Sequence, residues 1–128
     1  MELSGHSPFI VFDDVDLNKV TDMAIISKFR NNGQVCISPN RFYIHEKKKD
    51  EFANLMVEKT KKLKIGNGMD KDTLLGPLCT KQRLEGVEKL VETTKKEGGK
   101  VLLGGKRAAN FNKGYFYEPT IFLSLIHI

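Results

Sequence analysis

The stretch KFRNNGQVCISPNRFYIHE, from Lys28 to Glu46, places a cysteine in a polar loop between a helical pattern and a strand pattern. Turn-forming residues around Cys36 make a buried helix or strand core unfavourable here: Asn31, Asn32, Gly33, Ser38, Pro39 and Asn40. Arg30 lies six residues before Cys36 and Arg41 five after it, so nearby positive charge favours the thiolate. Cys36 is therefore a candidate nucleophile. The alternative interpretation is a small apolar side chain at the entrance of a strand.

Alternating helix and strand patterns flank this loop. Upstream, residues 8–12 (PFIVF) are a continuous apolar run typical of a buried strand, and apolar residues at helical spacing follow from Leu17 to about Phe29. Downstream we expect a strand over 41–45, a helix over 49–64, a helix capped by Thr80 and ended by the glycines at 98 and 99, a strand over 100–103, and an extended edge segment around Pro119. This order predicts an α/β fold with a mostly parallel sheet and flanking helices.

Length and composition restrict the class of protein. With 128 residues, 40% of them hydrophobic and 29% charged, the chain provides at most one globular domain. The sequence contains no apolar run long enough to span a bilayer and no signal-peptide pattern at its start. Its two cysteines lack the spacing of a zinc site or a disulfide framework. We therefore expect a cytoplasmic protein without a membrane segment or a metal site.

The net charge of +5, from 21 basic and 16 acidic residues, is modest. Most lysines alternate with glutamates along helical segments, as on ordinary solvated faces. Aromatic residues do not interleave with basic ones, so no stacking platform for nucleic acid is indicated. We expect no nucleic-acid partner, and salt-dependent nucleic-acid binding would be the mark of that alternative.

A nucleophilic thiol needs an acid or base within reach. The candidate carboxylate is Glu2, which precedes a Ser-Gly pair at the mouth of the first predicted strand. His6 or His45 would instead make a Cys–His pair of the peptidase kind, although a histidine at a strand end is more often packed or at the surface. Neither G-x-G-x-x-G nor G-x-x-x-x-G-K-[ST] occurs in the sequence.

Two linked motifs resemble the aldehyde dehydrogenase superfamily. Its Glu-Leu-Gly-Gly motif is similar to Glu2-Leu3-Ser4-Gly5, and its Gly-Gln-x-Cys motif is matched by Gly33-Gln34-Val35-Cys36. The separation of the glutamate and the cysteine, 36 − 2 = 34 residues, agrees as well. The segments KLKIGNGMD, LLGPL, KVLLGGKR and GYFYEPTIF follow in the order of the family. The resemblance covers about residues 1–122 and implies part of the catalytic domain.

The resemblance implies specific chemical roles. Cys36 would attack an aldehyde to give a thiohemiacetal, a hydride would leave to NAD or NADP, and water activated by Glu2 would hydrolyse the thioester. The backbone N–H of Cys36 would help to hold the oxyanion. Arg30 matches an arginine that binds the distal carboxylate of the substrate in the succinate-semialdehyde branch, although a solvated arginine at a helix end is the alternative.

The sequence also departs from the family pattern. Ser4 replaces a family glycine, where its Cβ would strain the turn that aims Glu2. Ser38 stands where some relatives have a second cysteine, which excludes a vicinal disulfide, and we interpret Cys79 as incidental.

The boundaries of the sequence suggest a fragment. In the family, most of the cofactor-binding domain and an asparagine that helps to bind the oxyanion precede the position of Glu2. Residues 123–128 (LSLIHI) do not resemble the continuation of the family sequence, and we interpret them as a non-native tail. We therefore expect residues 1–122 to be part of a catalytic domain that is inactive alone, from a full-length protein that forms homo-oligomers. The competing hypothesis is a non-catalytic binding or structural module that retains the fold.

Overall fold

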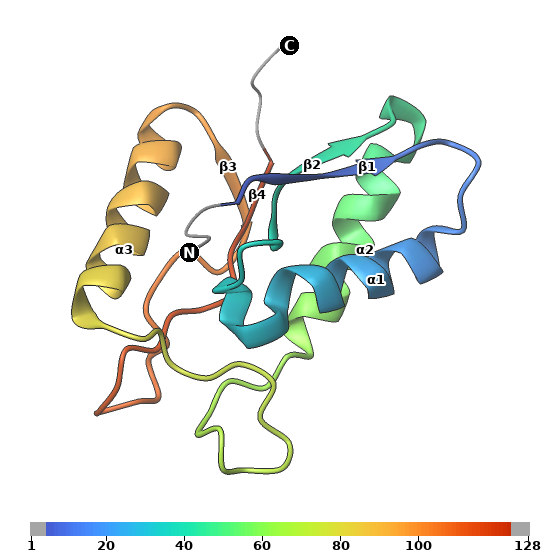
Figure 1. Ribbon diagram of the computed structural model, residues 1–128. Helices are drawn as coiled ribbons and strands as arrows, with labels where there is room; N and C mark the ends of the chain where they lie inside the picture. The colour runs from blue at the N-terminus through green and yellow to red at the C-terminus, as the bar shows by residue number, and fades with distance from the viewer. Residues whose placement is uncertain (1–4, 124–128) are drawn as a thin grey trace. The chain divides into compact units, whose positions relative to one another are not determined.

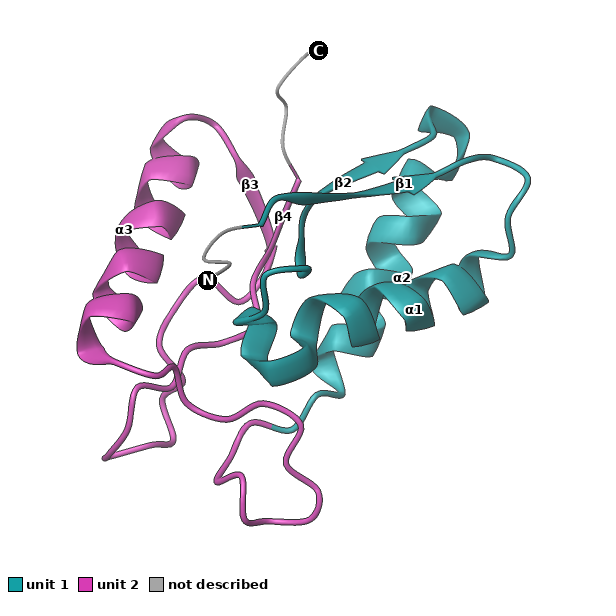
Figure 2. Ribbon diagram, viewed as in Figure 1, with its two compact units in different colours: residues 1–64 teal, residues 65–128 magenta. Residues whose placement is uncertain are grey.

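The computed structural model describes residues 5–123 of the chain. It divides the chain into two compact units, residues 1–64 and residues 65–128, which Figure 2 colours separately. Each unit has its own pair of strands and its own buried side chains. The two units are therefore described one after the other.

The first unit is built on a pair of parallel strands (Figure 1). Its elements in chain order are β1 (Ser7–Val11), α1 (Leu17–Phe29), the 3₁₀ turn η1 (Arg30–Gly33), β2 (Pro39–Ile44), η2 (Glu46–Lys48) and α2 (Lys49–Lys61). Phe9 lies opposite Phe42 in the β1–β2 ladder, and Val11 lies opposite Ile44. Parallel neighbours need a crossover connection, which α1 supplies. The predicted β–α–β–α order is confirmed in this unit.

Helix α1 begins at Leu17, where the helical spacing of apolar residues predicts it. The Asp16 carboxylate accepts the backbone N–H groups of Asn18 at 3.0 Å and Lys19 at 3.3 Å, so two N-terminal donors without helical partners are satisfied. Helix α2 ends at Lys61, three residues before the predicted end. There Lys62 and Leu63 donate to carbonyl oxygens only three residues back, which closes the helix with a tighter turn.

The core of the first unit joins the strand pair to both helices. Five apolar side chains have 5% or less of their surface exposed: Val11, Leu17, Ala24, Phe52 and Met56. The Phe42 ring connects the layers, because its centroid lies 5.2 Å from that of Phe9 on β1 and 6.3 Å from that of Phe52 on α2. Burying a large apolar side chain contributes about 1.5–3 kcal/mol, so this cluster stabilises the position of β2.

The second unit contains one long helix and two short strands: α3 (Lys81–Lys96), β3 (Lys100–Leu103) and β4 (Ile121–Leu123). As predicted, Thr80 caps α3, with its hydroxyl accepting the Arg83 N–H at 3.2 Å. Leu75, Leu84 and Val91 are the buried apolar side chains of this unit. Glu88 on α3 forms two hydrogen bonds with Arg107, which lies after β3.

The β3–β4 pair is antiparallel, whereas the element order predicted mostly parallel pairing. The connection explains the difference. Residues 104–120 join the two strands without a helix, so the chain turns back and the second strand runs the opposite way. The α/β class is retained, with one parallel and one antiparallel pair among the described residues.

Two general features bear on the function class. Within residues 5–123, no helix is both long and apolar enough to cross a membrane. The same residues contain no group of three or more histidine, cysteine, aspartate or glutamate side chains positioned to hold a metal ion.

Candidate functional site

Two consecutive turns form the loop between α1 and β2. The helix stops because Asn31, Asn32 and Gly33 have φ angles of 50°, 57° and 73°, in the left-handed region where asparagine and glycine are tolerated best. The Gln34 N–H then donates to the Asn31 carbonyl at 3.0 Å. A second turn follows directly, in which the Ser38 N–H donates to the Val35 carbonyl at 3.0 Å. Residues in left-handed conformations cluster at functional sites, and this loop has three in a row.

Cys36 occupies the second turn and is exposed. It forms no disulfide. Among residues 5–123 its backbone N–H donates to no carbonyl, unlike the N–H groups of Gln34 and Ser38 on either side of it. Within the described residues, Cys36 thus combines an exposed thiol with an N–H group that has no backbone acceptor.

The chain that precedes β1 meets this loop. A Cβ atom built on Gly5 would overlap the Cys36 carbonyl oxygen, so the backbones of the two segments are in direct contact. Glu2 and Ser4 lie outside the described residues. Both segments enter the parallel strands β1 and β2, which places the meeting point at the amino ends of these strands. Ligands of open α/β sheets usually gather at the carboxyl ends, so the general rule does not locate this site.

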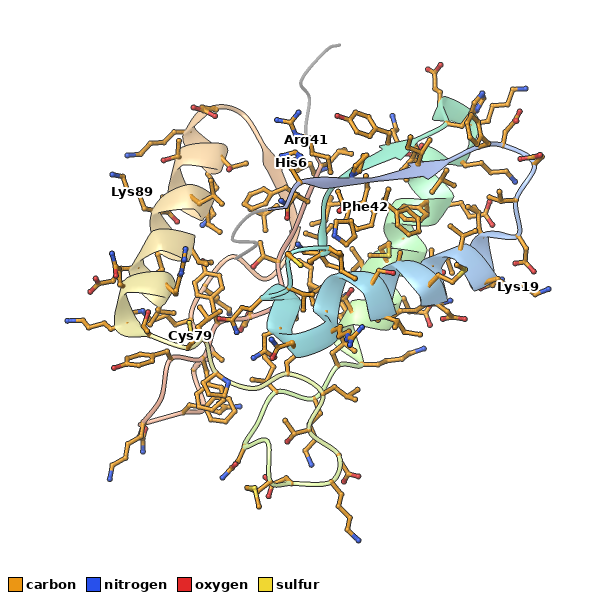
Figure 3. The ribbon with its side chains drawn as sticks, in the orientation of Figure 1. His6, Lys19, Arg41, Phe42, Cys79 and Lys89 are labelled. Atoms are coloured by element: carbon orange, nitrogen blue, oxygen red, sulfur yellow. The ribbon has the colours of Figure 1, made fainter. Side chains whose placement is uncertain are left out.

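The two arginines near Cys36 take different positions. Arg30 caps α1, donating its backbone N–H to the Ile26 carbonyl, and its side chain is exposed at the start of the Cys36 loop. Its guanidinium forms no ion pair with a carboxylate in the part of the chain that the structure describes. Arg41 is exposed on β2, after the loop, and is labelled in Figure 3. Of these two arginines, Arg30 is therefore the one that belongs to the loop that contains Cys36.

The alternative pairing of Cys36 with His45 is wrong. His45 follows the carboxyl end of β2, whereas Cys36 precedes its amino end, and the six residues of the strand span roughly 20 Å at about 3.3 Å per residue. The His45 ring is used elsewhere: Nδ1 accepts the Lys47 N–H at 3.3 Å, and Nε2 lies 4.0 Å from Asp13. His6, labelled in Figure 3, is exposed just before β1, and the described structure contains no hydrogen bond between it and Cys36.

Sequence reasoning missed one contact of this loop. The Ser38 hydroxyl donates to the Lys28 carbonyl at 3.2 Å, and the Lys28 ammonium lies 3.4 Å from the same hydroxyl oxygen. Ser38 is 3% exposed, and burial lowers the pKa of Lys28 below its ordinary value. Lys28 and Ser38 belong to no recognisable sequence motif. The sequence feature that could have indicated their contact was a lysine next to the apolar end of a helix.

The family comparison covers nearly the whole chain. The family model described as "Aldehyde dehydrogenase family" matches residues 1–126. The chain belongs to the aldehyde dehydrogenase family.

Curated relatives of this aldehyde dehydrogenase chain act on aldehydes of several kinds. The chain is 45% identical over 125 residues to a glutarate-semialdehyde dehydrogenase of Pseudomonas putida, covering 98% of this chain and 25% of the relative. It is 40% identical over 121 residues to a succinate-semialdehyde dehydrogenase [NADP(+)] of Schizosaccharomyces pombe, covering 94% of this chain and 24% of the relative. The chain therefore spans about a quarter of the length of these relatives.

The comparison with solved structures supports the same family. An NAD+ complex of an aldehyde dehydrogenase from Bacillus cereus superposes with a TM-score of 0.89 at 39% identity, over 94% of this chain and 24% of that one. The predicted partial α/β aldehyde dehydrogenase fold is confirmed. Members of the family use NAD or NADP, as this complex and the fission-yeast relative indicate.

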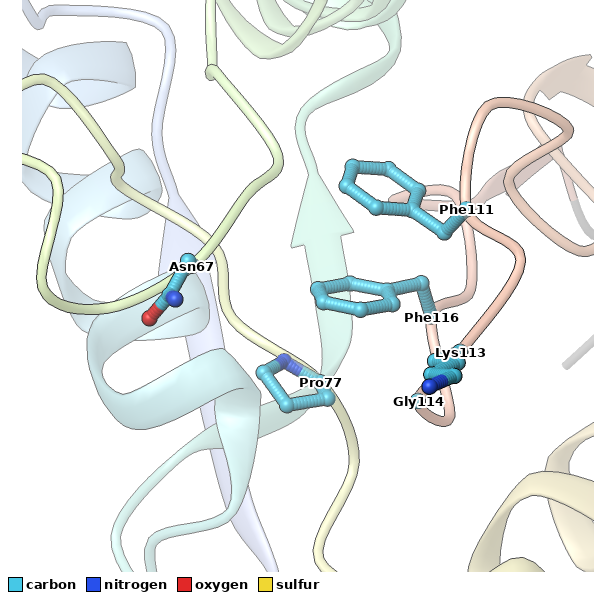
Figure 4. A pocket seen from close by; sticks show the side chains of 6 residues that line it. All are labelled: Asn67, Pro77, Phe111, Lys113, Gly114 and Phe116. Atoms are coloured by element: carbon cyan, nitrogen blue, oxygen red, sulfur yellow. The ribbon is translucent and has the colours of Figure 1, made fainter.

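The second unit of this aldehyde dehydrogenase chain contains an open cavity of about 450 Å³ (Figure 4). Its lining residues are Asn67, Pro77, Phe111, Lys113, Gly114 and Phe116. The rings of Phe111 and Phe116 stack at 4.0 Å. The lining includes none of the predicted site residues and offers one cationic side chain, and no glycine-rich phosphate loop accompanies it. It does not fit a dinucleotide, whose pyrophosphate needs several N–H donors at a helix N-terminus.

Cys79 also belongs to the second unit. It is exposed in the loop before α3 and is labelled in Figure 3. Its loop contains no left-handed residue, in contrast to the loop of Cys36. Cys79 therefore serves as an internal comparison for the reactivity of Cys36.

Proposed function

We propose that this chain is part of the catalytic domain of an NAD(P)-dependent aldehyde dehydrogenase that oxidises a semialdehyde, most simply succinate semialdehyde, to the carboxylic acid. The observation that carries the proposal is the exposed Cys36, held in the second of two consecutive turns in a segment that matches the family. We assign residues 1–122 to this domain.

Cys36 is the nucleophile in this proposal. Its thiolate attacks the aldehyde carbon, and the carbonyl oxygen gains charge as the thiohemiacetal forms. The Cys36 N–H, which has no backbone partner within residues 5–123, is available to donate to that oxygen. After oxidation the acyl group remains on the sulfur as a thioester, and hydrolysis of this bond releases the acid.

Glu2 is the base that activates the hydrolytic water. Glu2 lies three positions before Gly5, whose backbone contacts Cys36. Three residues of chain span at most about 11 Å, so Glu2 is within reach of the thioester. The described part of the chain supplies no other carboxylate in the Cys36 loop.

The nicotinamide cofactor supplies the hydride acceptor when it is bound. The cavity of the second unit does not fit it, so we place its binding site in the remainder of the full-length protein. The 128-residue chain alone should therefore not oxidise aldehydes. We also place the full-length enzyme in the cytoplasm, where a catalytic thiol stays reduced, and infer that it is a homo-oligomer.

The test compares two cysteine variants of the full-length protein. Cys36→Ala should lower kcat for aldehyde oxidation by about a thousandfold or more, because a covalent step is lost. Cys79→Ala is the matched control, since it removes an exposed cysteine outside the loop, and it should keep the activity. Aldehyde oxidation that survives Cys36→Ala would overturn the assignment. A protein that carries both cysteines and never oxidises an aldehyde would instead favour the non-catalytic module.

Arg30 is the group we propose to bind the distal carboxylate of the substrate. It is exposed in the same loop as Cys36, without a carboxylate partner in residues 5–123, and a guanidinium can hold a carboxylate through two parallel hydrogen bonds. Arg30→Ala should lower kcat/KM for succinate semialdehyde by about 10- to 100-fold, since a hydrogen bond to a charged group contributes about 1.5–3 kcal/mol.

A neutral substrate separates binding from general damage. Arg30→Ala should change kcat/KM for butyraldehyde, which lacks the carboxylate, by less than about threefold if each effect is local. Arg41→Ala provides the control, because Arg41 is also exposed but lies on β2. Equal losses on the acidic and the neutral aldehyde would remove the carboxylate-binding role from Arg30.

A further inference from the structure

Lys28 and Ser38 close the base of the loop that carries Cys36. The Ser38 hydroxyl donates to the Lys28 carbonyl at 3.2 Å, and the Lys28 ammonium approaches the same oxygen at 3.4 Å. One buried hydroxyl thus contacts both the backbone and the side chain of Lys28. The two residues flank Cys36 in the sequence: it lies eight residues after Lys28 and two residues before Ser38.

The path of the Lys28 side chain explains this geometry. A Cβ atom built on Gly33 would lie 3.1 Å from the Lys28 carbonyl oxygen, 3.8 Å from Lys28 Cε and 3.7 Å from Ser38 Oγ. The lysine stem therefore passes close to the left-handed turn and ends at Ser38. This turn, the stem and the serine therefore pack together at the base of the loop.

The environment of the ammonium is unusual for a lysine of this chain. Lys59 has 19% of its side chain exposed and pairs with Asp22 at 2.6 Å. Lys28 is half-buried, and within residues 5–123 it forms no ion pair with a carboxylate. Burial alone lowers the pKa of Lys28. A lysine that only covers apolar surface would keep its charged end in water, whereas this one directs it to a buried serine.

We propose that the Lys28–Ser38 pair is a clasp that positions Cys36 for nucleophilic attack. The proposal rests on the proposed function of Cys36, and it makes Lys28 and Ser38 positioning residues, since neither is assigned a contact with the substrate. The clasp holds the two ends of the loop at a fixed separation, so the turn from Val35 to Ser38 presents the thiol in one orientation. Positioning of this kind affects turnover, because small displacements of a reacting group are costly.

A double-mutant cycle in the full-length protein tests the clasp. Lys28→Met and Ser38→Ala should each lower kcat for succinate semialdehyde about tenfold, while KM changes less than about twofold. The double variant should be about as slow as Ser38→Ala alone, because Ser38→Ala already removes the contact that Lys28→Met removes. Lys28→Arg, which keeps a cationic donor, should recover part of the lost rate. A double variant about a hundredfold slower would show independent effects and overturn the clasp.

The control variant is Ser27→Ala. Ser27 precedes Lys28 on α1 and its hydroxyl donates to the Met23 carbonyl at 2.7 Å, within the helix, so this change leaves the loop intact. Losses no larger than those of Ser27→Ala would also overturn the proposal. Circular dichroism and the alkylation rate of Cys79 report on folding, and both should be unchanged in Lys28→Met and Ser38→Ala.

Alkylation separates failure of the clasp from failure of the proposed function. Iodoacetamide modifies thiols without any aldehyde or cofactor, so its rate at Cys36 reports directly on the loop. In Lys28→Met and Ser38→Ala this rate should change at least threefold while that of Cys79 stays constant. If it changes although the protein oxidises no aldehyde, the clasp stands and the proposed function fails. If the enzyme is active and the rate at Cys36 does not change in either variant, the clasp fails.

Discussion

Gly5 has a role that no other glycine of the first unit shares. Its missing side chain lets the segment before β1 contact the Cys36 carbonyl, because a Cβ atom at this position would overlap that oxygen. Gly5→Ala should therefore force the two segments apart and destabilise the protein by about 1–3 kcal/mol. The same displacement should lower aldehyde oxidation, since it moves the chain that carries Glu2 away from Cys36. Urea unfolding and steady-state kinetics of the full-length variant measure both effects.

Gly68 offers the matched control for Gly5. A Cβ atom on Gly68 meets no atom within 4 Å, so Gly68→Ala should change neither the stability nor the rate beyond about 0.5 kcal/mol. If the two alanine variants behave alike, the contact between Gly5 and the Cys36 loop does not position the site.

The individual site residues differ in how far the sequence reveals them. Cys36 and Arg30 belong to a motif with a fixed spacing, and they lie together in one loop as predicted. Lys28 and Ser38 could not be found in the same way, because a lysine and a serine ten residues apart meet only through the path of the chain between them. The left-handed turn that brings them together depends on three consecutive backbone angles, which a list of turn-forming residues does not specify.

Helix α3 allows a stability prediction of known sign. Gly86 lies in the helix interior, is exposed, and has open space around the position of a Cβ atom. Gly86→Ala should raise the free energy of unfolding by about 0.5–1 kcal/mol, because glycine loses more backbone entropy in a helix. Gly98, which follows the helix with a φ of 91°, should respond in the opposite direction to alanine. Urea unfolding of both variants checks the contrast, and two changes of equal sign would contradict it.

The Glu88–Arg107 pair should make the stability depend on pH. The Glu88 carboxylate accepts hydrogen bonds from Arg107, and these bonds hold the pKa of Glu88 below its ordinary value. At pH values between the pKa of Glu88 in the folded state and its pKa in the unfolded state, the unfolded chain binds more protons than the folded chain. The pair therefore stabilises the fold fully above the unfolded-state pKa of Glu88. This stabilisation is lost as the pH falls through the folded-state pKa. The effect should be small, because Arg107 is exposed and both partners are solvated.

Arg107→Gln provides the measurement for this pair. The variant should unfold in urea with a weaker dependence on pH below the ordinary pKa of glutamate, and NMR titration should place the pKa of Glu88 nearer that ordinary value. An unchanged titration of Glu88 would show that the pair does not form in solution.

Local patterns predicted the elements better than their pairing. Thr80 marked the start of α3 correctly, because capping depends on backbone donors within three residues. The antiparallel pairing of β3 with β4 was not predicted. This pairing requires residues 104–120 to reverse the direction of the chain without forming a helix. Glycines with positive φ at 104, 105 and 114 allow the reversal, but it also depends on contacts between residues that are far apart in the sequence.

The strand pair of the first unit indicates that the chain is adapted to a larger protein. Ile10 on β1 and Phe12, which directly follows the strand, are 60% and 64% exposed, whereas Val11 between them is buried. Parallel strands in α/β proteins are usually covered on both faces, so an apolar outer face calls for further packing. The chain spans about a quarter of its relatives, which supports covering of this face by the remainder of the full-length protein.

Opposite responses of the isolated chain and the full-length protein would test this interpretation. In the 128-residue chain, Ile10→Lys should reduce self-association and dye binding, because it replaces exposed apolar surface with a charge. In the full-length protein the same change should destabilise by about 2–4 kcal/mol, since it would bury an unpaired ammonium. Met69, 89% exposed in a loop of the second unit, gives the control, and Met69→Lys should be neutral in both settings. If the full-length protein tolerates Ile10→Lys as well as Met69→Lys, the outer face of β1 is solvated and the apolar side chains there have no packing role.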